Sequence, residues 1–421
     1  MQKICVLGLG YIGLPTAAMF ATHGYQVLGV DVNKKVIDTL NQGEVHIEEP
    51  GLKTLVSGAL NSGQLKIELK PASSDVYIIA VPTPITDDKK ADMSYVVTAA
   101  RSIVPVLEEG NLVILEATSP PRTTIDLVQP ILEESGLKGG EDFLLAYSPE
   151  RVLPGKILNE LVNNSRVIGG INQVSAKAGK LLYSSFVAGE IIETDSTTAE
   201  MVKLMENTYR DINIAAANEF SRLAEYFGID VWEAIDIANL HPRVEILKPG
   251  PGVGGHCISV DPWFFVEKAP DLALLIKQAR EVNDSQPAFV IQLLKERYGS
   301  LKGKSFAALG ITYKSDVDDI RESPAIDVIE RLVTEGAVVE AFDPYVGSNS
   351  PGLDFLVDEL EEVLSNADGI LLLVNHSQFK ELNPAEVLPL LNEGFILDTR
   401  NVLLKEDWIK AGFEVKTLGE K

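Results

Sequence analysis

The feature that most constrains the fold lies within the first 31 residues. An apolar run, Lys3–Leu7, leads into Gly8-Leu-Gly-Tyr-Ile-Gly13, then a stretch of small and apolar residues, then a second apolar run that ends at Asp31. Short apolar runs bounded by glycine predict buried strands, so the order is strand, glycine turn, helix, strand. In this order a helix N-terminus presents free N–H groups and a positive dipole to a pyrophosphate. The pattern predicts an α/β fold that binds a dinucleotide.

The residues of this turn have separate expected roles. The first two glycines allow the tight turn and the close approach of a pyrophosphate, and the third allows the helix to pack on the strand. Asp31 would accept hydrogen bonds from the adenosine ribose, and its charge would repel a 2′-phosphate, so NAD is expected rather than NADP. A turn shaped by packing alone is the alternative. The candidate cofactor contacts in the turn are Gly8, Gly10, Tyr11, Ile12 and Gly13.

The strand rhythm continues to about residue 195. Apolar runs at 75–81, 111–116 and 143–147 are each followed by prolines, and two more at 167–170 and 190–194 complete the expected first sheet. In a parallel sheet, the carboxyl ends of the strands line the ligand crevice. A threonine also suits a strand end for structural reasons, and that alternative stays open. The candidate crevice residues are Thr83, Thr118, Glu150 and Arg151.

From about residue 196 the pattern changes to one long helix. Apolar residues recur at steps of three and four, with no internal Gly or Pro, over about thirty residues. Lys203 and Asn207 are one turn apart on one face, with Arg210 close to that face. Met201, Leu204 and Met205 flank the lysine, which predicts a partly buried group usable as an acid, a base or an oxyanion partner. A solvated lysine is the alternative, and the helix is also the expected seam of a homodimer or larger homo-oligomer.

A stretch rich in glycine and proline, 249–257, ends at Cys257 and is followed by Asp261. Such a backbone bends tightly and lets a ligand approach closely. The chain has two cysteines, so neither a disulfide framework nor a metal cluster is expected. Cys5 lies in the first strand and is predicted to be core. Cys257 is therefore the candidate nucleophile, while His256 is expected to be structural because adjacent residues usually point to opposite sides.

A second α/β run begins near residue 301, with expected strands at 305–309, 338–342, 369–374 and 395–398. It lacks the triple-glycine turn. Lys314, Arg321 and Arg400 lie near its strand ends and, in a chain of net charge −24, they indicate a second site for an anionic ligand such as a nucleotide diphosphate. Surface charge is the alternative. The predicted architecture is α/β: two Rossmann-like, doubly wound parallel-sheet domains, 1–195 for NAD and 301–421 for the second nucleotide, joined by a central helical region, 196–300.

The acidic balance also bears on partners. A net charge of −24 and a pI near 4.6 argue against nucleic acid or anionic membrane surfaces as partners. No run approaches the roughly 18 apolar residues of a membrane span. The apolar N-terminus is better explained by the glycine turn than by a signal peptide, which is the alternative. Two cysteines fit a reducing compartment, so a cytoplasmic protein is expected.

This set of residues permits one particular chemistry. A nicotinamide cofactor implies hydride transfer, and a nearby thiolate adds a covalent route. After a carbinol is oxidised to an aldehyde, Cys257 can add to it as a thiohemiacetal. A second oxidation gives a thioester, which water hydrolyses to a carboxylate. Lys203 would take the first proton and Asn207 would hold a water, which Glu150 or Asp261 would activate.

Together these motifs resemble the UDP-glucose/GDP-mannose dehydrogenases, the nucleotide-sugar 6-dehydrogenase family, over nearly the whole chain. The resemblance implies oxidation of a sugar C6 hydroxyl by four electrons with two NAD, through the cysteine route above. The motifs that carry it are Gly8-Leu-Gly-Tyr-Ile-Gly13, Val81-Pro-Thr-Pro84, Ser148-Pro-Glu-Arg151, Lys203-Leu-Met-Glu-Asn207, Gly254-Gly-His-Cys257-Ile-Ser-Val-Asp261 and Arg321-Glu-Ser-Pro324.

The resemblance also implies a role for each matching residue. Cys257 takes the place of the family's nucleophile and Lys203 that of its acid–base group, while Asn207 and Asp261 match its water-handling pair. Arg243 matches an arginine that reaches the substrate of a neighbouring subunit. The other active-site matches are Thr118 and Glu150. Matches to cofactor and substrate contacts are Arg321 for the cofactor and Arg151, Val152, Lys203, Asn207, Arg210, His241, Gly254, Tyr313, Lys314 and Arg400 for the substrate.

Three further stretches narrow the expected substrate. His241-Pro-Arg243, Asp261-Pro-Trp-Phe264 and Ala279-Arg-Glu-Val-Asn-Asp284 are similar to the branch that acts on UDP-N-acetyl-mannosamine, and Pro154 stands where UDP-glucose enzymes carry a second acidic residue. The expected substrate is a UDP-N-acetyl-hexosamine, with UDP-N-acetyl-D-mannosamine favoured over UDP-N-acetylglucosamine, UDP-N-acetylgalactosamine and UDP-glucose. Two other classes stay open: a two-electron hydroxy-acid dehydrogenase, and a non-catalytic sensor of NAD or nucleotide sugars.

Overall fold

A computed structural model describes residues 2–153 and 155–421 of the chain. The chain forms two compact units, Met1–Glu206 with Trp263–Pro270, and Asn207–Pro262 with Asp271–Lys421. Each unit contains one sheet. The helices that separate the two sheets in the sequence, residues 196–298, are divided between the two units. Pro154, which bears on the substrate prediction, lies outside the described residues.

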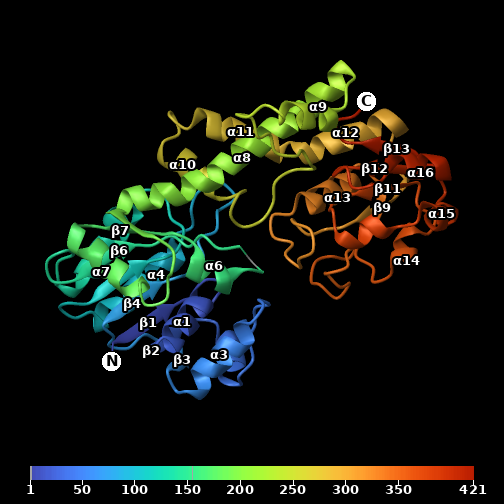
Figure 1. Ribbon diagram of the computed structural model, residues 1–421. Helices are drawn as coiled ribbons and strands as arrows, with labels where there is room; N and C mark the ends of the chain where they lie inside the picture. The colour runs from blue at the N-terminus through green and yellow to red at the C-terminus, as the bar shows by residue number, and fades with distance from the viewer. Residues whose placement is uncertain (1, 154) are drawn as a thin grey trace. The chain divides into compact units, whose positions relative to one another are not determined.

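The first unit is built on an eight-stranded sheet of order β3-β2-β1-β4-β5-β6-β7-β8 (Figure 1). β6 and β7 pair antiparallel and all other neighbours are parallel, so the expectation of a wholly parallel sheet is wrong at this one pair. The chain leaves β6 at its carboxyl end and re-enters the sheet from that same edge after a short helix. The strands are β1 (Lys3–Leu7), β2 (Gln26–Val30), β3 (Leu65–Glu68), β4 (Val76–Ile79), β5 (Leu112–Leu115), β6 (Leu144–Tyr147), β7 (Arg166–Gly170) and β8 (Ile191–Asp195).

Helices cover both faces of this sheet. Alternate residues of β1 enter different cores, because successive side chains of a strand point to opposite faces. Ile4 and Val6 pack with α1, α3 and α6, while Cys5 and Leu7 pack with α4 and α5. Cys5 is buried as predicted, and burial raises the pKa of its thiol to about 12. The helices are α1 (Gly13–Thr22), α2 (Lys34–Asn41), α3 (Leu52–Asn61), α4 (Ser94–Ile103), α5 (Gln129–Leu132), α6 (Ile157–Asn163) and α7 (Gln173–Tyr183).

The second unit contains a five-stranded sheet of order β10-β9-β11-β12-β13, parallel throughout as predicted. The sequence did not reveal β13 or, in the first sheet, β3. Both are four-residue edge strands with charged residues, and such strands give a weak hydrophobic signal. The elements are β9 (Ser305–Leu309), β10 (Val338–Phe342), β11 (Gly369–Leu372), β12 (Phe395–Asp398), β13 (Glu414–Thr417), α13 (Pro324–Thr334), α14 (Leu360–Leu364), α15 (Pro384–Val387) and α16 (Lys405–Ala411).

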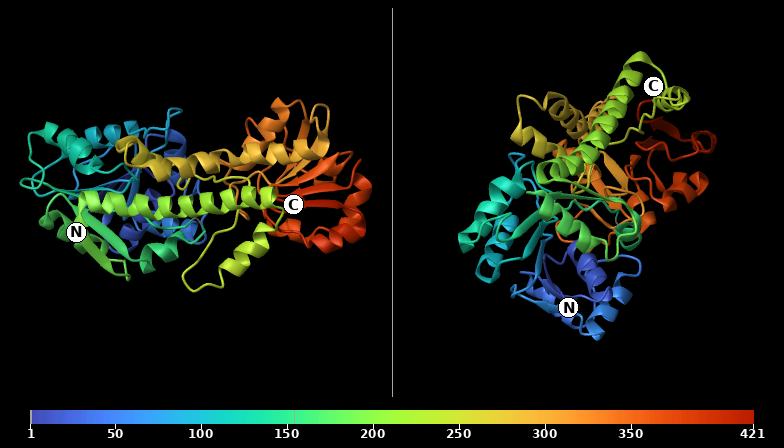
Figure 2. Two further views of the ribbon diagram at one scale, coloured as in Figure 1. Left: turned by 90° about the horizontal axis from the view of Figure 1, so that it is seen from above. Right: turned by 60° about the vertical axis from the view of Figure 1, so that its left-hand side comes forward.

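The long helix α8 (Ser196–Phe227) runs unbroken for 32 residues, as predicted (Figure 2). It ends at Phe227, before Gly228, whose φ of 72° suits glycine, and α9 (Val231–Ala238) follows. Asp261 opens α10 (Asp261–Lys268), a helix that the sequence did not predict. The remaining helices are α11 (Leu274–Asp284) and α12 (Gln286–Tyr298).

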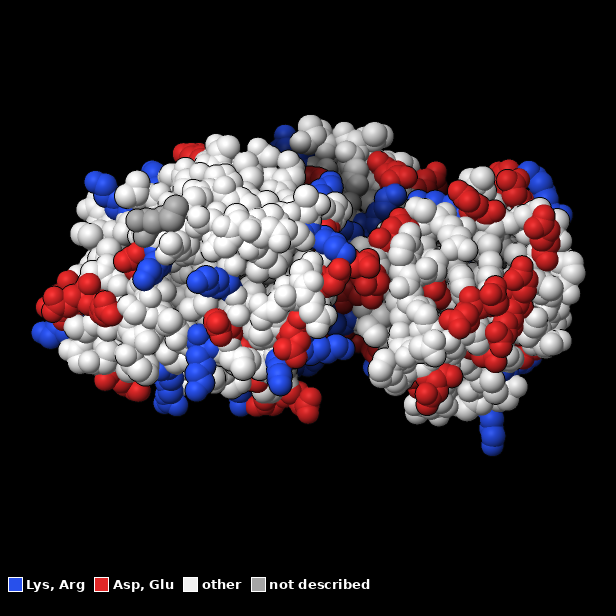
Figure 3. Space-filling view, turned by 90° about the horizontal axis from the view of Figure 1, so that it is seen from below, with Lys and Arg blue, Asp and Glu red and all other residues white. Residues whose placement is uncertain are grey.

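The surface reflects the acidic composition. Figure 3 shows acidic side chains spread over the C-terminal α/β domain, with few basic ones among them.

Among the described residues, none of the helices has the length and apolar character of a membrane span. In the same part of the chain, no group of three or more His, Cys, Asp or Glu side chains is arranged to hold a metal ion.

Candidate active site

The three glycines of the first turn differ in what surrounds them. A Cβ at Gly8, where φ is 92°, would lie 2.6 Å from the oxygen of Ala80, and a Cβ at Gly13 would lie 1.8 Å from the oxygen of Gly8. Both glycines are therefore required by packing. A Cβ at Gly10 would meet no heavy atom within 4 Å, so this position faces open space. α1 begins here without a side-chain cap, and the first N–H groups of a helix lack intrahelical partners, an arrangement that suits the pyrophosphate of a dinucleotide.

Asp31 ties the end of β2 to this turn. Its Oδ2 accepts a hydrogen bond from the N–H of Leu9 at 2.9 Å, and its Oδ1 accepts one from the N–H of Asn33 at 2.8 Å. An ionised carboxylate has further acceptor sites, so the same group has capacity left for a ribose hydroxyl. His46, which the sequence did not suggest, lies nearby: burial lowers the pKa of its imidazole, while Asp31 opposes that change.

The structure brings together the two crevice threonines. The Thr83 hydroxyl donates to the main-chain oxygen of Thr118 at 2.6 Å, which joins the segments that follow β4 and β5. Both side chains are half-buried. The bond gives Thr83 a structural role at this edge, and both threonines lie at the carboxyl ends of adjacent strands as predicted.

Glu150 belongs to a buried charge cluster that the sequence did not suggest. The guanidinium of Arg166 donates to Glu150 Oε2, to Glu116 Oε1 at 3.1 Å and to Ser148 Oγ at 2.8 Å. The Tyr183 hydroxyl donates to Glu116 Oε1 at 2.6 Å, and its ring lies 4.2 Å from the Arg166 guanidinium carbon. Because β7 runs antiparallel to β6, Arg166 begins its strand beside the residues that follow β6.

One guanidinium in this cluster serves two carboxylates. Burial raises the pKa of Glu116 to about 7, although Arg166 opposes that rise. Arg166 is 4% exposed and Glu150 is 8% exposed, so solvent compensates little of the charge. The arrangement fixes the Glu150 carboxylate in place. The sequence signal that could have revealed this cluster was a charged residue at one end of each of two apolar runs. These are Glu116 at the end of 111–116 and Arg166 just before 167–170.

The segment after Glu150 is held by ion pairs and hydrogen bonds. Arg151 pairs with Glu206 at 2.5 Å and donates to the main-chain oxygen of Ser165 at 3.0 Å. Glu49, another residue that the sequence did not single out, accepts from the N–H groups of Gly155 and Ile157, each at 2.7 Å. Val152, between these anchors, is half-buried.

Lys203 is half-buried on α8. The reason given by the sequence is only partly right: Leu204 is buried, but Met201 and Met205 are 39% and 56% exposed. The methionines belong to an outer face of the helix. Lys203 thus lies at the border between the buried and exposed faces.

In the second unit, three of the predicted residues are joined. Asp261 N–H donates to the main-chain oxygen of Cys257 at 2.8 Å, and the Asn207 amide donates to Asp261 Oδ2 at 2.5 Å. Asp261 is 3% exposed and Asn207 9% exposed, while the cysteine is half-buried. One turn therefore carries a thiol and a carboxylate, and the amide of α8 orients the carboxylate.

The glycines of the cysteine loop make room for the protein's own chain, a packing role that the sequence did not suggest. A Cβ at Gly254 would lie 2.4 Å from the oxygen of Glu322, and one at Gly255, where φ is 85°, would lie 2.8 Å from the ring of Tyr313. Gly255 N–H also donates to the oxygen of Arg321 at 3.0 Å. The segment 313–324 thus packs directly against the loop that carries the cysteine.

Asp319 organises this second segment. It accepts hydrogen bonds from Arg321 Nε at 2.9 Å and Nη2 at 2.6 Å, and it lies 3.9 Å from His256 Nδ1. Burial pushes the pKa of Asp319 upward, but the hydrogen bonds from Arg321 hold it below its usual range. His256 therefore faces an acidic partner here, and the structural role expected for it stays a prediction. The sequence signal for Asp319 was its position two residues before Arg321, the basic residue of the Arg321-Glu-Ser-Pro324 motif.

The remaining basic candidates differ in burial. Arg400 is half-buried and donates to the oxygen of Leu373 at 3.2 Å. Burial lowers the pKa of its guanidinium to about 10, with Asp398 opposing, so it stays charged at neutral pH. The others are exposed, Arg210 on α8, Lys314 after β9, and His241 and Arg243 on the segment after α9.

The two units define the class of protein: one carries a dinucleotide turn, and the other a cysteine turn beside a second α/β domain. The chain matches the UDP-glucose/GDP-mannose dehydrogenase family in its NAD binding domain over residues 2–187, its central domain over 197–285 and its UDP binding domain over 307–405. The chain belongs to this family. It is an NAD-dependent oxidoreductase that acts on a nucleotide sugar.

Individual relatives agree along the whole chain. A protein of Methanococcus maripaludis named UDP-N-acetyl-D-mannosamine dehydrogenase is 49% identical, with 100% of this chain and 97% of the relative covered. An NDP-N-acetyl-D-galactosaminuronic acid dehydrogenase of Ralstonia nicotianae is 46% identical over 95% of this chain and 96% of the relative. The solved UDP-D-ManNAc dehydrogenase of Pyrococcus horikoshii superposes with a TM-score of 0.92 at 43% identity, covering 99% of both chains.

Proposed function

We propose that this protein oxidises the C6 hydroxyl of UDP-N-acetyl-D-mannosamine to the uronic acid in a four-electron reaction with two NAD. The observation that carries the proposal is the turn in which Cys257, Asp261 and Asn207 are joined. A thiol beside an oriented carboxylate suits a covalent acyl intermediate that water then hydrolyses. The names of the most similar relatives support the N-acetyl-hexosamine. The proposed domain roles are NAD binding for 1–195, the central helical region for 196–300 and UDP-sugar binding for 301–421.

The proposed mechanism assigns each step to a residue. NAD, when bound, accepts the hydride of each oxidation. Lys203 takes the proton of the C6 hydroxyl in the first, and the Cys257 thiolate adds to the aldehyde carbon to form a thiohemiacetal. The second oxidation turns this adduct into a thioester, and water displaces the sulfur to give the carboxylate and the free thiol. Asp261, oriented by Asn207, and Glu150 are the groups proposed to activate that water.

Substrate and cofactor contacts are proposed from the same placement. Arg400 stays charged although it is half-buried, which suits a nucleotide diphosphate in a chain of net charge −24. Thr83, Thr118 and Asp31 are the proposed cofactor contacts beyond the glycine turn, with Arg321. The other proposed substrate contacts are Arg151, Val152, Lys203, Asn207, Arg210, His241, Arg243, Gly254, Tyr313 and Lys314.

NADH formation across a panel of UDP-sugars tests this function. We expect two NADH for each uronic acid formed, with kcat/KM highest for UDP-N-acetyl-D-mannosamine. UDP-N-acetylglucosamine, UDP-N-acetylgalactosamine and UDP-glucose form the comparison set, and the product is quantified by chromatography. One NADH per product would point instead to a two-electron dehydrogenase. Ligand-induced thermal stabilisation with no NADH from any sugar would point to a sensor.

We also propose that the protein forms a homodimer with α8 at its interface. Five large apolar side chains on α8, here called the α8 seam, are between 42% and 68% exposed, and their spacing places them on one face of the helix. An exposed apolar row of this length marks a protein interface, and a copy of the same helix is self-complementary about a two-fold axis. The α8 seam consists of Met205, Tyr209, Phe220, Leu223 and Phe227.

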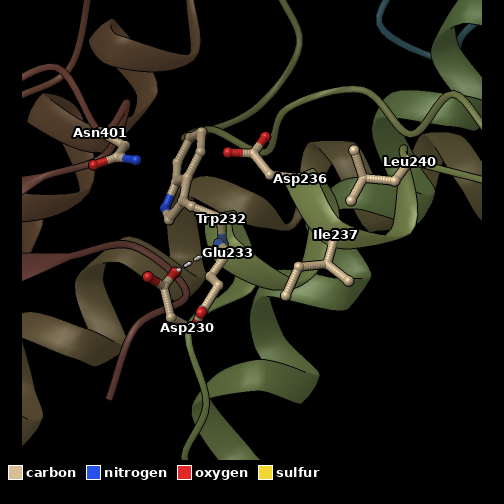
Figure 4. A pocket seen from close by; sticks show the side chains of 7 residues that line it. All are labelled: Asp230, Trp232, Glu233, Asp236, Ile237, Leu240 and Asn401. Atoms are coloured by element: carbon tan, nitrogen blue, oxygen red, sulfur yellow. Dashed lines mark hydrogen bonds between the residues drawn. The ribbon is translucent and has the colours of Figure 1, made fainter.

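A hollow beside α9, lined by both apolar and acidic side chains, lies near the end of α8 (Figure 4). Ile237 and Leu240 are 60% and 81% exposed and lie along it, while Asp230 caps the helix by accepting from Trp232 N–H at 2.8 Å. The neighbouring segment that bears Arg243 is exposed as well. We propose that a second subunit docked along α8 covers both the hollow beside α9 and the segment that bears Arg243.

Sedimentation velocity tests the dimer. A charge on the α8 seam, Phe220→Glu, is expected to give a monomer with an unchanged circular dichroism spectrum, because a buried unpaired carboxylate opposes association. Leu272→Glu is the matched control: it changes an 85% exposed leucine outside the seam and is expected to leave the dimer intact. A wild-type monomer, or a dimer that survives Phe220→Glu, would contradict the seam. A cytoplasmic location stays a prediction of the sequence.

A further inference from the structure

A chain of buried polar side chains connects α8 and α11 to the cysteine loop within the second unit. Asn218 Oδ1 accepts a hydrogen bond from Gly250 N–H at 2.9 Å, and Asn218 Nδ2 donates to Asn283 Oδ1 at 2.9 Å. Asn283 Nδ2 then donates to Asp211, to its main-chain oxygen at 3.1 Å and to Oδ1 at 2.8 Å. None of these three side-chain residues is more than 1% exposed. They are called the Asn218–Asn283–Asp211 chain below.

The hydrogen bonds of this chain can run in only one direction. A main-chain N–H only donates, and an ionised carboxylate only accepts. Each asparagine must therefore turn its oxygen toward Gly250 and its NH₂ toward Asp211, since a flipped amide would face like with like. The direction is set by the two ends and passes through both amides.

Arg280 anchors the acidic end of the chain. Its Nη1 donates to Asp211 Oδ1 at 2.5 Å, and its Nη2 donates to Asp284. Burial raises the pKa of Asp211, and Arg280 opposes that rise. Among the described residues, every hydrogen bond to the Asp211 carboxylate goes to Oδ1, and Oδ2 accepts none. A single oxygen thus serves both Arg280 and Asn283.

The other end of the chain holds the start of the cysteine loop. Gly250 is buried, and a Cβ there would lie 2.5 Å from Arg400 Nη1, so any side chain at this position would have to displace that guanidinium. A Cβ at Gly252 would lie 3.4 Å from the main-chain oxygen of Asn283. Without Asn218, the buried N–H of Gly250 would lose its acceptor, which is costly in an apolar interior. The loop is held here, and again at Gly255, before it reaches Cys257.

We propose that Asn218 and Asn283 are positioning residues for Cys257: through Gly250 they fix the loop on which the thiol sits. The catalytic meaning of this inference rests on the proposed function of Cys257 as nucleophile, but the hydrogen bonds do not. Reaction rates are sensitive to such placement, because a displacement of about 1 Å can cost about 100-fold in rate.

Two substitutions that keep the shape of the side chain distinguish the effect of breaking this hydrogen-bond chain from the effect of lowering the stability of the whole protein. Asn218→Asp places an oxygen against Asn283 Oδ1, and the repulsion between the two oxygens pushes the side chain out of its place under Gly250, so the chain is broken. Asp211→Asn keeps Oδ1 as the acceptor for Asn283, so the chain survives, while Arg280 loses a charged partner. Hydrogen–deuterium exchange of the peptide 249–257, read by mass spectrometry without any ligand, reports whether the loop is held.

In Asn218→Asp we expect the amides of the loop to exchange about tenfold faster or more, and kcat to fall by about tenfold or more with a smaller change in KM. In Asp211→Asn we expect a lower melting temperature but wild-type protection of the loop. If Asn218→Asp does not fold, Asn218→Ser replaces it, because the serine side chain is too short to reach both partners. The same increase in the exchange rate of the loop amides is expected.

Wild-type protection in the Asn218 variants would overturn the inference. Equal exposure in Asn218→Asp and Asp211→Asn would also overturn it, because the loop would then follow overall stability and not the direction of the chain. The exchange measurement needs no substrate. If the loop behaves as expected but no sugar nucleotide yields NADH, the proposed function fails and the positioning role stands.

Discussion

Cys257→Ser is expected to lower the rate of uronic acid formation on the order of 10³-fold or more while still allowing oxidation to the aldehyde. A serine hydroxyl is not ionised at neutral pH and is a much weaker nucleophile than a thiolate, so we do not expect the thiohemiacetal and thioester to form. The measurement combines chromatography of the uronic acid with trapping of the aldehyde by an amine reagent.

The controls for this variant come from the chain itself. Cys5→Ala removes the other thiol, which is buried in β1, and is expected to leave kcat unchanged. Alkylation of the wild type by iodoacetamide is expected to modify Cys257 alone, because Cys5 is both buried and protonated. Full uronic acid formation by Cys257→Ser would exclude a covalent route, and water would then have to add directly to the aldehyde.

Arg166→Met is expected to lower the free energy of unfolding by about 3–5 kcal/mol. The substitution keeps much of the buried volume but leaves Glu116 and Glu150 without their shared cation. Removing one partner of a buried ion pair costs more than the pair itself contributes, because the remaining charges stay desolvated. Urea unfolding followed by circular dichroism measures the loss.

The pH dependence of this variant has a definite sign. Burial already raises the pKa of Glu116 to about 7 with Arg166 present, and without the guanidinium it rises further. The folded variant then binds more protons than the unfolded chain above the ordinary carboxyl pKa, so its stability falls as the pH rises. The loss is expected to be larger at pH 8 than at pH 5. Arg166→Met combined with Glu116→Gln is expected to regain part of it, and an equal loss at both pH values would contradict the shared-charge description.

The parts of the fold and site that the sequence predicted are those set by neighbouring residues. Gly8, Gly10 and Gly13 are close in sequence, and their turn follows from local backbone geometry together with the apolar runs on either side. The long helix α8 was predicted for the same reason, because its period is continuous. The pairing of Asn207 with Asp261 came from the family resemblance, and the structure places the two in contact.

The parts that the sequence missed depend on contacts between distant residues. Arg166 and Glu116 are 50 positions apart, and only the antiparallel entry of β7 brings them together. The glycines at 254 and 255 were expected to favour a ligand, because a glycine-rich segment looks the same whether its neighbour is a sugar or a tyrosine. Three-dimensional packing decides between these explanations, and local pattern does not.

The direct packing of the segment 313–324 against the cysteine loop has a mechanical consequence. Gly254 lies directly against the main-chain oxygen of Glu322 and Gly255 against the ring of Tyr313, so a shift of one segment toward the other displaces it. Tyr313, Lys314 and Arg321 all belong to that segment. Under the substrate contacts proposed for Tyr313 and Lys314, any displacement of this segment on nucleotide binding would be passed on to the loop that carries Cys257.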